Sequence, residues 1–476
     1  MKENNNLVKL FNNKAQSTNT WYSKNKYYNR DIEKLCKFLI PENSSVLEIG
    51  CGIGNLLSCV KPKRGIGVDF SPDMIEIARS LHPDLEFIIA DAHKLSTINS
   101  KKPYDYIILS NLISYLDDIQ TALLEVKKIC NENTRVIITY HNYLWEPFLT
   151  LAEKIGQRSP QPINLNWLSD GDIENFLYLA GLEVVKKGKR FLIPKYIPII
   201  GRLFNGYIDK LPIIRNLCLT SYVVAKPVIE RKSWDNKYRV SVLIPAMNEK
   251  GNIEDAVKRI PKLGKQTEII FVEGGSKDGT WQEIERVYSK FKNDYSMIIM
   301  QQDGRGKGDA VRKGFDAATG DILMILDADL TVMPEDLKKF YDVIASGKGE
   351  FINGSRLVYQ MEDHAMRFLN LLGNKFFSML FTWLLDQRFK DTLCGTKVLF
   401  KKDYEKLKEG RSYFGEFDPF GDFDLIFGAS KLNLKIIELP IRYKERTYGQ
   451  TNISRFKHGL LLLRMCLFAA RKIKFI

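Results

Sequence analysis

The sequence predicts an α/β protein of two domains, each built on a largely parallel sheet covered by helices. The chain has 476 residues, which exceeds the size at which one hydrophobic core usually stops growing. Apolar strands alternate with helical segments twice, from Val46 onward and again from Val240 onward. The polar segment 227–238 begins at a proline, and we interpret it as a linker. We therefore expect domains at residues 1–226 and 239–476.

The composition indicates a folded chain from a reducing compartment. Apolar residues make up 45% of the sequence and charged residues 27%, which is typical of globular proteins. The seven cysteines form no Cys-x-x-Cys pair, and no secretory signal precedes them. We expect a cytoplasmic chain with reduced thiols and without a zinc site.

The first predicted strand of the N-terminal half leads into a loop rich in glycine. Residues 1–30 show little periodicity, so we expect a polar lead-in with one helix at most. The strand at 45–49 is followed by Gly50, Gly52 and Gly54, and glycines let a backbone approach a ligand closely at the start of a helix. A second strand ends in Asp69, about 20 residues later, where ribose hydroxyls are usually held. A third strand, 85–91, ends in another acid, a fourth, 104–110, runs into Asn111, and we place the last two at 182–187 and 218–224.

The segment Glu48-x-Gly50-x-Gly52-x-Gly54 and the acids after the next two strands resemble the class I S-adenosylmethionine-dependent methyltransferases over most of residues 40–226. The resemblance implies a Rossmann-like sheet with S-adenosylmethionine as cofactor. It assigns the cofactor to Glu48 and the three glycines around the methionine part, Asp69 at the ribose hydroxyls, and Asp91 with Ala92 at the adenine. Each acid could instead be an ordinary polar strand end.

The motif requires no catalytic base, since methyl transfer depends mainly on alignment and exclusion of water. His141, after the predicted strand 135–140, is a candidate base, and an ordinary loop histidine is the alternative. The apolar segment 191–204 could be an acceptor lid, a membrane-touching loop or part of the core.

In the C-terminal half, Asp327 and Asp329 end the apolar run 321–326. Two carboxylates one residue apart at the end of a strand suit an oxygen-preferring divalent cation that also binds a diphosphate. An isolated Asp-x-Asp is more often a solvated turn, but here three other motifs precede it. They are the strand and loop 240–249, the strand and loop 268–280, and the glycine-rich segment 304–308.

This order of motifs resembles the family 2 glycosyltransferases, and within them the dolichyl-phosphate mannose synthase-like branch, over about residues 238–458. The resemblance implies a GT-A, Rossmann-like domain with amphipathic helices, a UDP- or GDP-linked sugar donor, Mg²⁺ or Mn²⁺, and inversion at the anomeric carbon. Asp329 is then the more direct metal ligand, and Asp327 lies nearer the ribose or a second coordination site. The residues expected around the nucleotide sugar are Pro245, Asn248, Glu249, Glu273, Lys307 and Asp327. Relatives usually carry Asp-Asp-Gly-Ser where this chain has Glu273-Gly-Gly-Ser, so one acid is missing.

The acceptor decides what else this site needs. A lipid phosphate is already anionic and needs cations, whereas a hydroxyl acceptor needs a base. Arg356, Arg367 and Arg446 match positions that bind phosphate in polyprenyl-phosphate enzymes. Asp391 matches an acid near the acceptor, where it would act as a catalytic base or orient an arginine. A second acid pair, Asp422 with the acid two residues later, lacks a preceding apolar strand, so we expect it to be structural.

The basic C-terminal region indicates a negatively charged partner. The chain carries a net charge of +14, and residues 431–476 contain eleven Lys or Arg and two Glu, a net of +9. No nucleic-acid motif accompanies it. The apolar stretch 460–470 is too short and too charged to span a membrane, and Asn374 and Lys375 argue against a span at 366–385. We expect both to be amphipathic helices at a membrane surface, with ordinary docked or buried helices as the alternative.

Together these observations predict a bifunctional enzyme on the cytoplasmic face of a membrane. It would transfer sugar from a nucleotide to a polyprenyl phosphate and methyl groups from S-adenosylmethionine in one glycan or glycolipid pathway, without binding nucleic acid. The oligomeric state is left open. One alternative is a glycosyltransferase for a soluble or glycan hydroxyl acceptor. A further alternative makes the N-terminal half a non-catalytic binding module.

Overall fold

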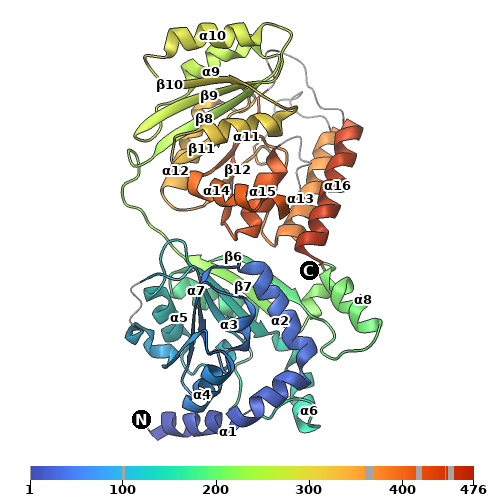
Figure 1. Ribbon diagram of the computed structural model, residues 1–476. Helices are drawn as coiled ribbons and strands as arrows, with labels where there is room; N and C mark the ends of the chain where they lie inside the picture. Colours follow the sequence, from blue (N-terminus) through green and yellow to red (C-terminus); the bar gives the residue numbers. More distant parts are fainter. Residues whose placement is uncertain are drawn as a thin grey trace. The chain divides into compact units, whose positions relative to one another are not determined.

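The computed structural model describes residues 2–98, 102–161, 163–359, 368–413, 421–444, 446, 448 and 455–475 (Figure 1). The chain separates into two compact units, Met1–Val228 with Lys474–Ile476 and Ile229–Ile473. Each contains a seven-stranded mixed sheet with helices on both faces, so the predicted α/β class with two sheets is confirmed. In the described part of the chain, the helices are all too short or too polar to cross a lipid bilayer.

The sheet of the first unit has the strand order β3-β2-β1-β4-β5-β7-β6. The first five strands in this order are parallel, and β7 is antiparallel to both of its neighbours. Its strands are β1 (Ser45–Ile49), β2 (Arg64–Asp69), β3 (Glu86–Ile89), β4 (Tyr106–Ser110), β5 (Arg135–His141), β6 (Leu182–Arg190) and β7 (Thr220–Pro227). Its helices are α1 (Lys2–Lys24), α2 (Lys26–Leu39), α3 (Asn55–Cys59), α4 (Pro72–Leu81), η1 (Ala92–Thr97), η2 (Ile113–Tyr115), α5 (Ile119–Lys128), η3 (Tyr143–Trp145), α6 (Glu146–Lys154), α7 (Asp170–Leu179), α8 (Ile200–Gly206), η4 (Ile208–Lys210) and η5 (Ile214–Leu217). The central strands are buried almost throughout, as expected for parallel strands covered on both faces.

The start of the chain differs from the expectation of a polar lead-in with one helix at most. Residues 2–39 form two helices, α1 and α2. The apolar side of α2 is buried in the core, and Ala15 of α1 packs with Ile53 and Met74 beside the glycine-rich loop. The sequence did not show this pattern clearly, because the few buried apolar residues of the two helices lie among many polar residues.

The segment 191–204 does not belong to the core, apart from Phe191. Ile199 is 84% exposed, and four other apolar side chains of the segment are also exposed: Tyr196, Ile197, Ile200 and Leu203. The core alternative is therefore wrong for most of this segment, while the lid and membrane alternatives stay predictions.

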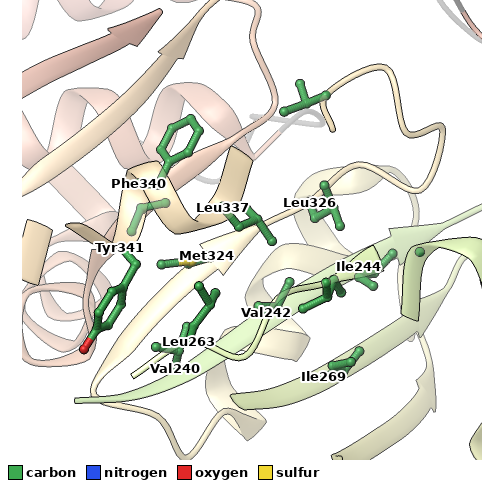
Figure 2. Close-up of a cluster of buried hydrophobic side chains, with 14 of the residues drawn as sticks. Val240, Val242, Ile244, Leu263, Ile269, Met324, Leu326, Leu337, Phe340 and Tyr341 are labelled. Carbon is green, nitrogen blue, oxygen red and sulfur yellow. The ribbon is translucent and has the colours of Figure 1, made fainter. Parts of the chain in front are cut away.

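The sheet of the second unit has the order β10-β9-β8-β11-β13-β12-β14, in which β13 is antiparallel to both neighbours. Its strands are β8 (Arg239–Ala246), β9 (Gln266–Glu273), β10 (Ser296–Gln301), β11 (Ile322–Ile325), β12 (Phe351–Ser355), β13 (Lys397–Phe400) and β14 (Ile436–Pro440). Its helices are η6 (Lys250–Asn252), α9 (Ile253–Arg259), α10 (Thr280–Phe291), α11 (Lys307–Ala317), η7 (Pro334–Asp336), α12 (Leu337–Ala345), α13 (Phe368–Leu385), α14 (Lys401–Glu409), η8 (Arg411–Tyr413), α15 (Asp422–Lys431) and α16 (Arg455–Ile473). Figure 2 shows the core where Val242 of β8 and Met324 of β11 meet Leu337 and Phe340 of α12.

Helices α13 and α16 lie side by side (Figure 1). Asn374 does not interrupt α13, because its side chain is buried against the interior of this unit. Both helices expose large apolar side chains, namely Leu372, Phe376 and Met379 of α13 and Leu460, Leu463 and Leu467 of α16. Their spacing along each helix gathers them on one side.

Candidate active sites

In both units several candidate residues follow the carboxyl ends of parallel strands at the point where the strand order reverses. In the first unit β1 lies between β2 and β4, and in the second β8 lies between β9 and β11. Such switch points are where ligands usually bind in open α/β sheets, because the loops there diverge to opposite faces.

The glycine-rich loop of the first unit has the tight geometry that its sequence predicted. Gly50, Gly52 and Gly54 all have positive φ, between 52° and 78°. A Cβ atom at Gly50 would lie 2.7 Å from Leu112 Cδ1, and one at Gly54 would lie 2.6 Å from Phe87 Cζ. At Gly52 it would point into open space. Two of the glycines therefore permit close packing, and the third presents bare backbone.

Asp69 fastens this loop to the end of β2. Its Oδ2 accepts a hydrogen bond from the backbone N–H of Gly52 at 2.9 Å, and its Oδ1 accepts one from the N–H of Ser71 at 3.0 Å. Burial raises the pKa of this carboxyl despite those bonds. Asp69 thus orients the loop, and its predicted contact with ribose stays a prediction.

Glu48 and Asp91 occupy different environments. Burial, with a smaller effect from the charge of Asp69, raises the pKa of Glu48 to about 8. Asp91 Oδ1 accepts hydrogen bonds from His93 N at 2.9 Å and Nδ1 at 2.7 Å. Burial alone would raise the pKa of Asp91, but these hydrogen bonds hold that pKa below its usual range. Ala92 begins the short helix that Asp91 caps.

His141, the candidate base, ends β5 in a partly buried position. Its Nε2 lies 3.3 Å from the hydroxyl of Tyr28, which donates to Asn111 Oδ1 at 3.2 Å. Burial, followed by the charge of Arg158, lowers the pKa of His141 to about 3. A neutral imidazole with so low a pKa is a weak base, so the geometry favours a positioning role. Tyr28 was missed because it lies in the helix that the sequence did not predict.

In the second unit, Asn248 joins the loops that follow β8 and β9. Its N–H donates to Ser276 Oγ at 2.8 Å, and its Oδ1 accepts from the N–H of Lys277 at 2.9 Å. Glu273 is buried and its Oε1 accepts from the N–H of Ser276 at 2.5 Å. Glu273, which stands where relatives usually carry the first Asp of Asp-Asp-Gly-Ser, therefore stabilises the loop that follows it. Pro245 lies within β8, in register with β9.

Asp327 is paired with the predicted diphosphate-binding lysine. Lys307 Nζ lies 2.6 Å from Asp327 Oδ1. Burial would raise the pKa of Asp327, but the charges of Lys307, Lys397 and Arg356 hold it below its usual range. Gly395 approaches so closely that a Cβ atom there would lie 1.9 Å from Asp327 Oδ2. This lysine and this acid thus occupy one polar centre, which excludes any larger side chain at position 395.

Asp329 and Glu249 share Arg446. Arg446 Nη2 lies 2.6 Å from Asp329 Oδ2, and its Nη1 lies 3.0 Å from Glu249 Oε1. Asp329 Oδ1 accepts hydrogen bonds from the N–H of Thr331 at 3.2 Å and its Oγ1 at 2.8 Å. Burial, only partly offset by Arg446, raises the pKa of Glu249 to about 7. The arginine predicted for the acceptor therefore contacts the acids predicted for the donor.

Asp391 is fully buried and bound to Arg356 in a bidentate pair. Arg356 Nε lies 2.8 Å from Asp391 Oδ2, and Arg356 Nη2 lies 2.9 Å from Oδ1. The N–H groups of Arg356 and Leu393 and the Nδ2 of Asn374 also donate to this carboxylate. Burial is outweighed by Arg356, so the pKa of Asp391 lies well below its usual range. Of the two roles left open for this acid, the contacts favour orientation of the arginine. Arg367 lies outside the described residues.

Lys397 was missed by the sequence analysis. It is completely buried at the start of β13, its ammonium group donates to the carbonyl of Cys394, and its Nζ lies 3.5 Å from Asp422 Oδ1. Nothing in its local pattern separates it from a surface lysine, although its place six residues after Asp391 could have drawn notice. Asp422 therefore pairs with a cation next to the site.

The carboxylate oxygens of Asp327 and Asp329 suit a divalent cation whose remaining ligands come from a substrate. Among the described residues, no three or more His, Cys, Asp or Glu side chains gather into a metal-binding group. Mg²⁺ commonly takes one or two carboxylates and completes its shell with phosphate oxygens and water. Two acids at the end of one strand fit that arrangement.

Comparison with known proteins supports a two-part chain. A model described as "Methyltransferase domain" matches residues 22–187, and one described as "Glycosyl transferase family 2" matches residues 241–407. The chain is 30% identical over 221 residues to a dolichol-phosphate mannosyltransferase of Pyrococcus furiosus, covering 45% of this chain and 59% of that protein. It is 25% identical over 236 residues to a dolichyl-phosphate beta-glucosyltransferase of Dictyostelium discoideum, covering 46% and 70%. The chain thus spans less than two thirds of the first relative.

A solved structure from Thermotoga maritima, described as an S-adenosylmethionine-dependent methyltransferase and possible histamine N-methyltransferase, aligns with 46% of this chain and 97% of its own. The identity is 18% and the TM-score 0.36. The family model, and not this distant match, identifies the N-terminal half. Both predicted family resemblances are confirmed by the family models.

Proposed function

The chain joins a methyltransferase domain to a family 2 glycosyltransferase domain, and we propose that it glycosylates a polyprenyl phosphate and methylates a product or precursor of the same pathway. The Arg356–Asp391 pair is the observation that carries the choice of acceptor. An acid held by a buried arginine is a poor base for a hydroxyl. A cation fixed by that acid suits an anionic acceptor. The names of the two relatives, both dolichyl-phosphate enzymes, support the same acceptor class.

For the donor, we assign Asp327 and Asp329 to a Mg²⁺ or Mn²⁺ ion, with Lys307 beside them. Such an ion would offset the negative charge that develops on the departing nucleoside diphosphate. Lys307 begins α11, so its charge and the N–H groups of the helix start act on the same phosphates. Arg446, which pairs with Asp329 and Glu249, would turn to the phosphates once they replace those carboxylates as its partners. The acceptor oxygen attacks the anomeric carbon opposite the leaving phosphate, which inverts the configuration.

The hydroxyl-acceptor alternative gains its support from Glu249. Its pKa of about 7 is that of a competent general base near neutral pH. Its pairing with Arg446 and its place in the donor loop count against that role. Short polyprenyl phosphates decide between the two, because the alternative predicts no product with them.

For the N-terminal half, we propose that S-adenosylmethionine lies over the bare backbone of Gly52 with its ribose near Asp69. The positive φ angles, the open space at Gly52 and the loop contacts of Asp69 support this assignment. The cofactor supplies a methyl group on a sulfonium, and the protein aligns the acceptor with it and excludes water.

We also propose that the enzyme works at the cytoplasmic face of a membrane. The exposed apolar side chains of α13 and α16 give a surface that a bilayer can cover, and the net charge of +9 over residues 431–476 favours anionic lipid. A helix pair in this position would bring a lipid phosphate toward Arg356 from the side.

The test incubates the full chain with Mg²⁺, a short polyprenyl phosphate and a panel of labelled nucleotide sugars, and measures label in the organic extract. We expect one donor to give lipid-extractable product, and D329A to abolish it while binding of S-adenosylhomocysteine is retained. D294A, which removes an exposed acid, serves as the matched control. Transfer that persists in D329A, or in thoroughly chelated buffer, would overturn the metal assignment. Label found only on added sugars or glycans would overturn the lipid acceptor.

A further inference from the structure

Helix α1 connects the two sides of the candidate methyltransferase site. On one side, Asn12 Oδ1 accepts a hydrogen bond from Ser71 Oγ at 2.6 Å, and the ring of Phe11 lies 5.0 Å from that of Phe70, directly after Asp69. On the other side, Phe11 lies 5.8 Å from the ring of Tyr115, in the loop after β4. This helix, which lies beside α4 (Figure 1), therefore contacts the loops that follow β2 and β4.

Lys14 of this helix lies beside Tyr115, and no carboxylate among the described residues pairs with it. Its Nζ donates to Gln161 Oε1 at 3.3 Å and lies 5.8 Å from the centre of the Tyr115 ring. Tyr115 donates to the same Gln161 oxygen at 2.5 Å. Among the described residues, Lys14 has no acid within ion-pair distance. A partly buried lysine that rests on an amide and aromatic rings keeps its charge available for a ligand.

Arg158 places a second positive charge at the same point. Arg158 is partly buried and lies three residues before Gln161, in the loop that the bond from the Gln161 N–H to Glu153 closes. Its charge also lowers the pKa of His141, at the end of β5. Burial, and then repulsion by Arg158, lowers the pKa of Lys14 to about 8. Glu153 opposes that shift, and its Oε1 accepts the N–H of Gln161 at 2.8 Å. The cluster thus holds two cations and one acid.

Two cations brought together from distant parts of the chain destabilise the empty protein, and an anion between them would relieve that repulsion. The cluster lies beside the ends of β4 and β5, where Asn111 and His141 contact Tyr28. Strand β4 neighbours β1, whose carboxyl end carries the glycine-rich loop. We propose that Lys14 and Arg158, beside that edge of the sheet, bind a phosphate or carboxylate group of the methyl acceptor. This inference rests on the proposed methyltransferase activity and names the charge of its substrate.

An apolar surface borders the cluster. Helix α6, which ends four residues before Arg158, buries none of its residues and exposes Phe148 and Leu151, and Ile155 follows them. Two sources of the anion therefore fit: the phosphate of a lipid-linked sugar, with its lipid along α6, or a free sugar phosphate or sugar acid. Both share the same binding chemistry.

The experiment measures how fast Lys14 of the full chain is reductively methylated by isotopic formaldehyde, with Lys9 of the same helix as the internal control. Lys9 is exposed and outside the cluster. Chelated buffer and saturating S-adenosylhomocysteine are used throughout. The probes are inorganic phosphate, glucuronate, and vesicles of phosphatidylcholine with or without phosphatidic acid. At ten times the dissociation constant, a bound anion leaves about one site in eleven empty, so the labelling of Lys14 should slow roughly tenfold.

We expect at least one anionic probe to protect Lys14 and not Lys9, and R158A to remove that protection while K154A, a neighbouring exposed lysine, keeps it. Protection by phosphatidic acid vesicles alone would assign the anion to a lipid headgroup. Protection by phosphate or glucuronate would assign it to a soluble or solvent-presented sugar. Equal rates for Lys14 with every probe would overturn the anion site. Binding of S-adenosylhomocysteine is measured separately by calorimetry. If it binds but no probe protects Lys14, only the anion site is wrong; if it does not bind, the cofactor assignment is wrong.

Discussion

Replacing Arg356 with Met tests whether Asp391 depends on this arginine for its charge. Asp391 is completely buried and Arg356 is 11% exposed, so the substitution leaves a carboxylate without its cation in the protein interior. Removing one partner of a buried ion pair typically costs about 3–5 kcal/mol. In a unit of this size, 1 kcal/mol corresponds to about 2–4 °C, so the melting temperature should fall by about 6–20 °C.

The pH dependence gives this prediction a sign. Arg356 holds the pKa of Asp391 in the folded protein below that of the unfolded chain. The stabilisation is therefore fully present above the ordinary carboxyl pKa of about 4 and is lost as the pH falls below it. The difference between the native protein and R356M should be largest near neutral pH and shrink in acid.

The assay is thermal unfolding followed by circular dichroism at several pH values, with R388M as the control. Arg388 is exposed, and its replacement should change the melting temperature little. The double variant R356M/D391N should be less destabilised than R356M, because the amide removes the buried charge that lost its partner. If R356M has the melting temperature of the native protein, or if R356M/D391N melts at a lower temperature than R356M, the two residues do not act as a buried ion pair.

Three further predictions follow from single contacts. G395A should reduce sugar transfer strongly without loss of S-adenosylhomocysteine binding, because the new Cβ would displace Asp327 from a position 1.9 Å away; normal transfer in a labelled-sugar assay would contradict this. E48Q should raise the melting temperature at pH 8 and above but not at pH 4. The pKa of Glu48 is raised in the folded state, so the native protein loses stability as the pH rises from the ordinary carboxyl pKa of about 4 to about 8. A difference in melting temperature that does not change with pH would be inconsistent with a neutral buried acid. D69N should weaken S-adenosylhomocysteine about tenfold in calorimetry, since it removes one charge-assisted bond to the N–H of Gly52, worth about 1.5 kcal/mol; unchanged affinity would show that the loop does not depend on this acid.

Much of the candidate sites could be predicted because their residues lie at fixed places in a local pattern. Gly50, Gly52 and Gly54 directly follow strand β1 of the first unit, where the chain turns tightly. Asp327 comes shortly after the buried strand β11 of the second unit. Parallel strands bring their carboxyl ends to one edge, so residues that end different strands meet whatever the length of chain between them.

Other contacts could not be predicted because they depend on orientation in three dimensions. No pattern indicated that Asn374, within an apolar helix, would bond to Asp391, or that Arg446 would bridge Asp329 and Glu249. The pair of helices α1 and α2, where at most one helix was expected, was not predicted for a related reason, since their few buried side chains lie among many polar residues.

The sequence by itself determined the two sheets, the glycine-rich loop and the acids at the strand ends, because hydrophobic period and turn chemistry act over a few neighbouring residues. Only the tertiary structure decided which charges neutralise one another. No local pattern names the partners of a cation such as Lys397 or Arg356, because these are set by which elements pack beside it and how far they exclude water.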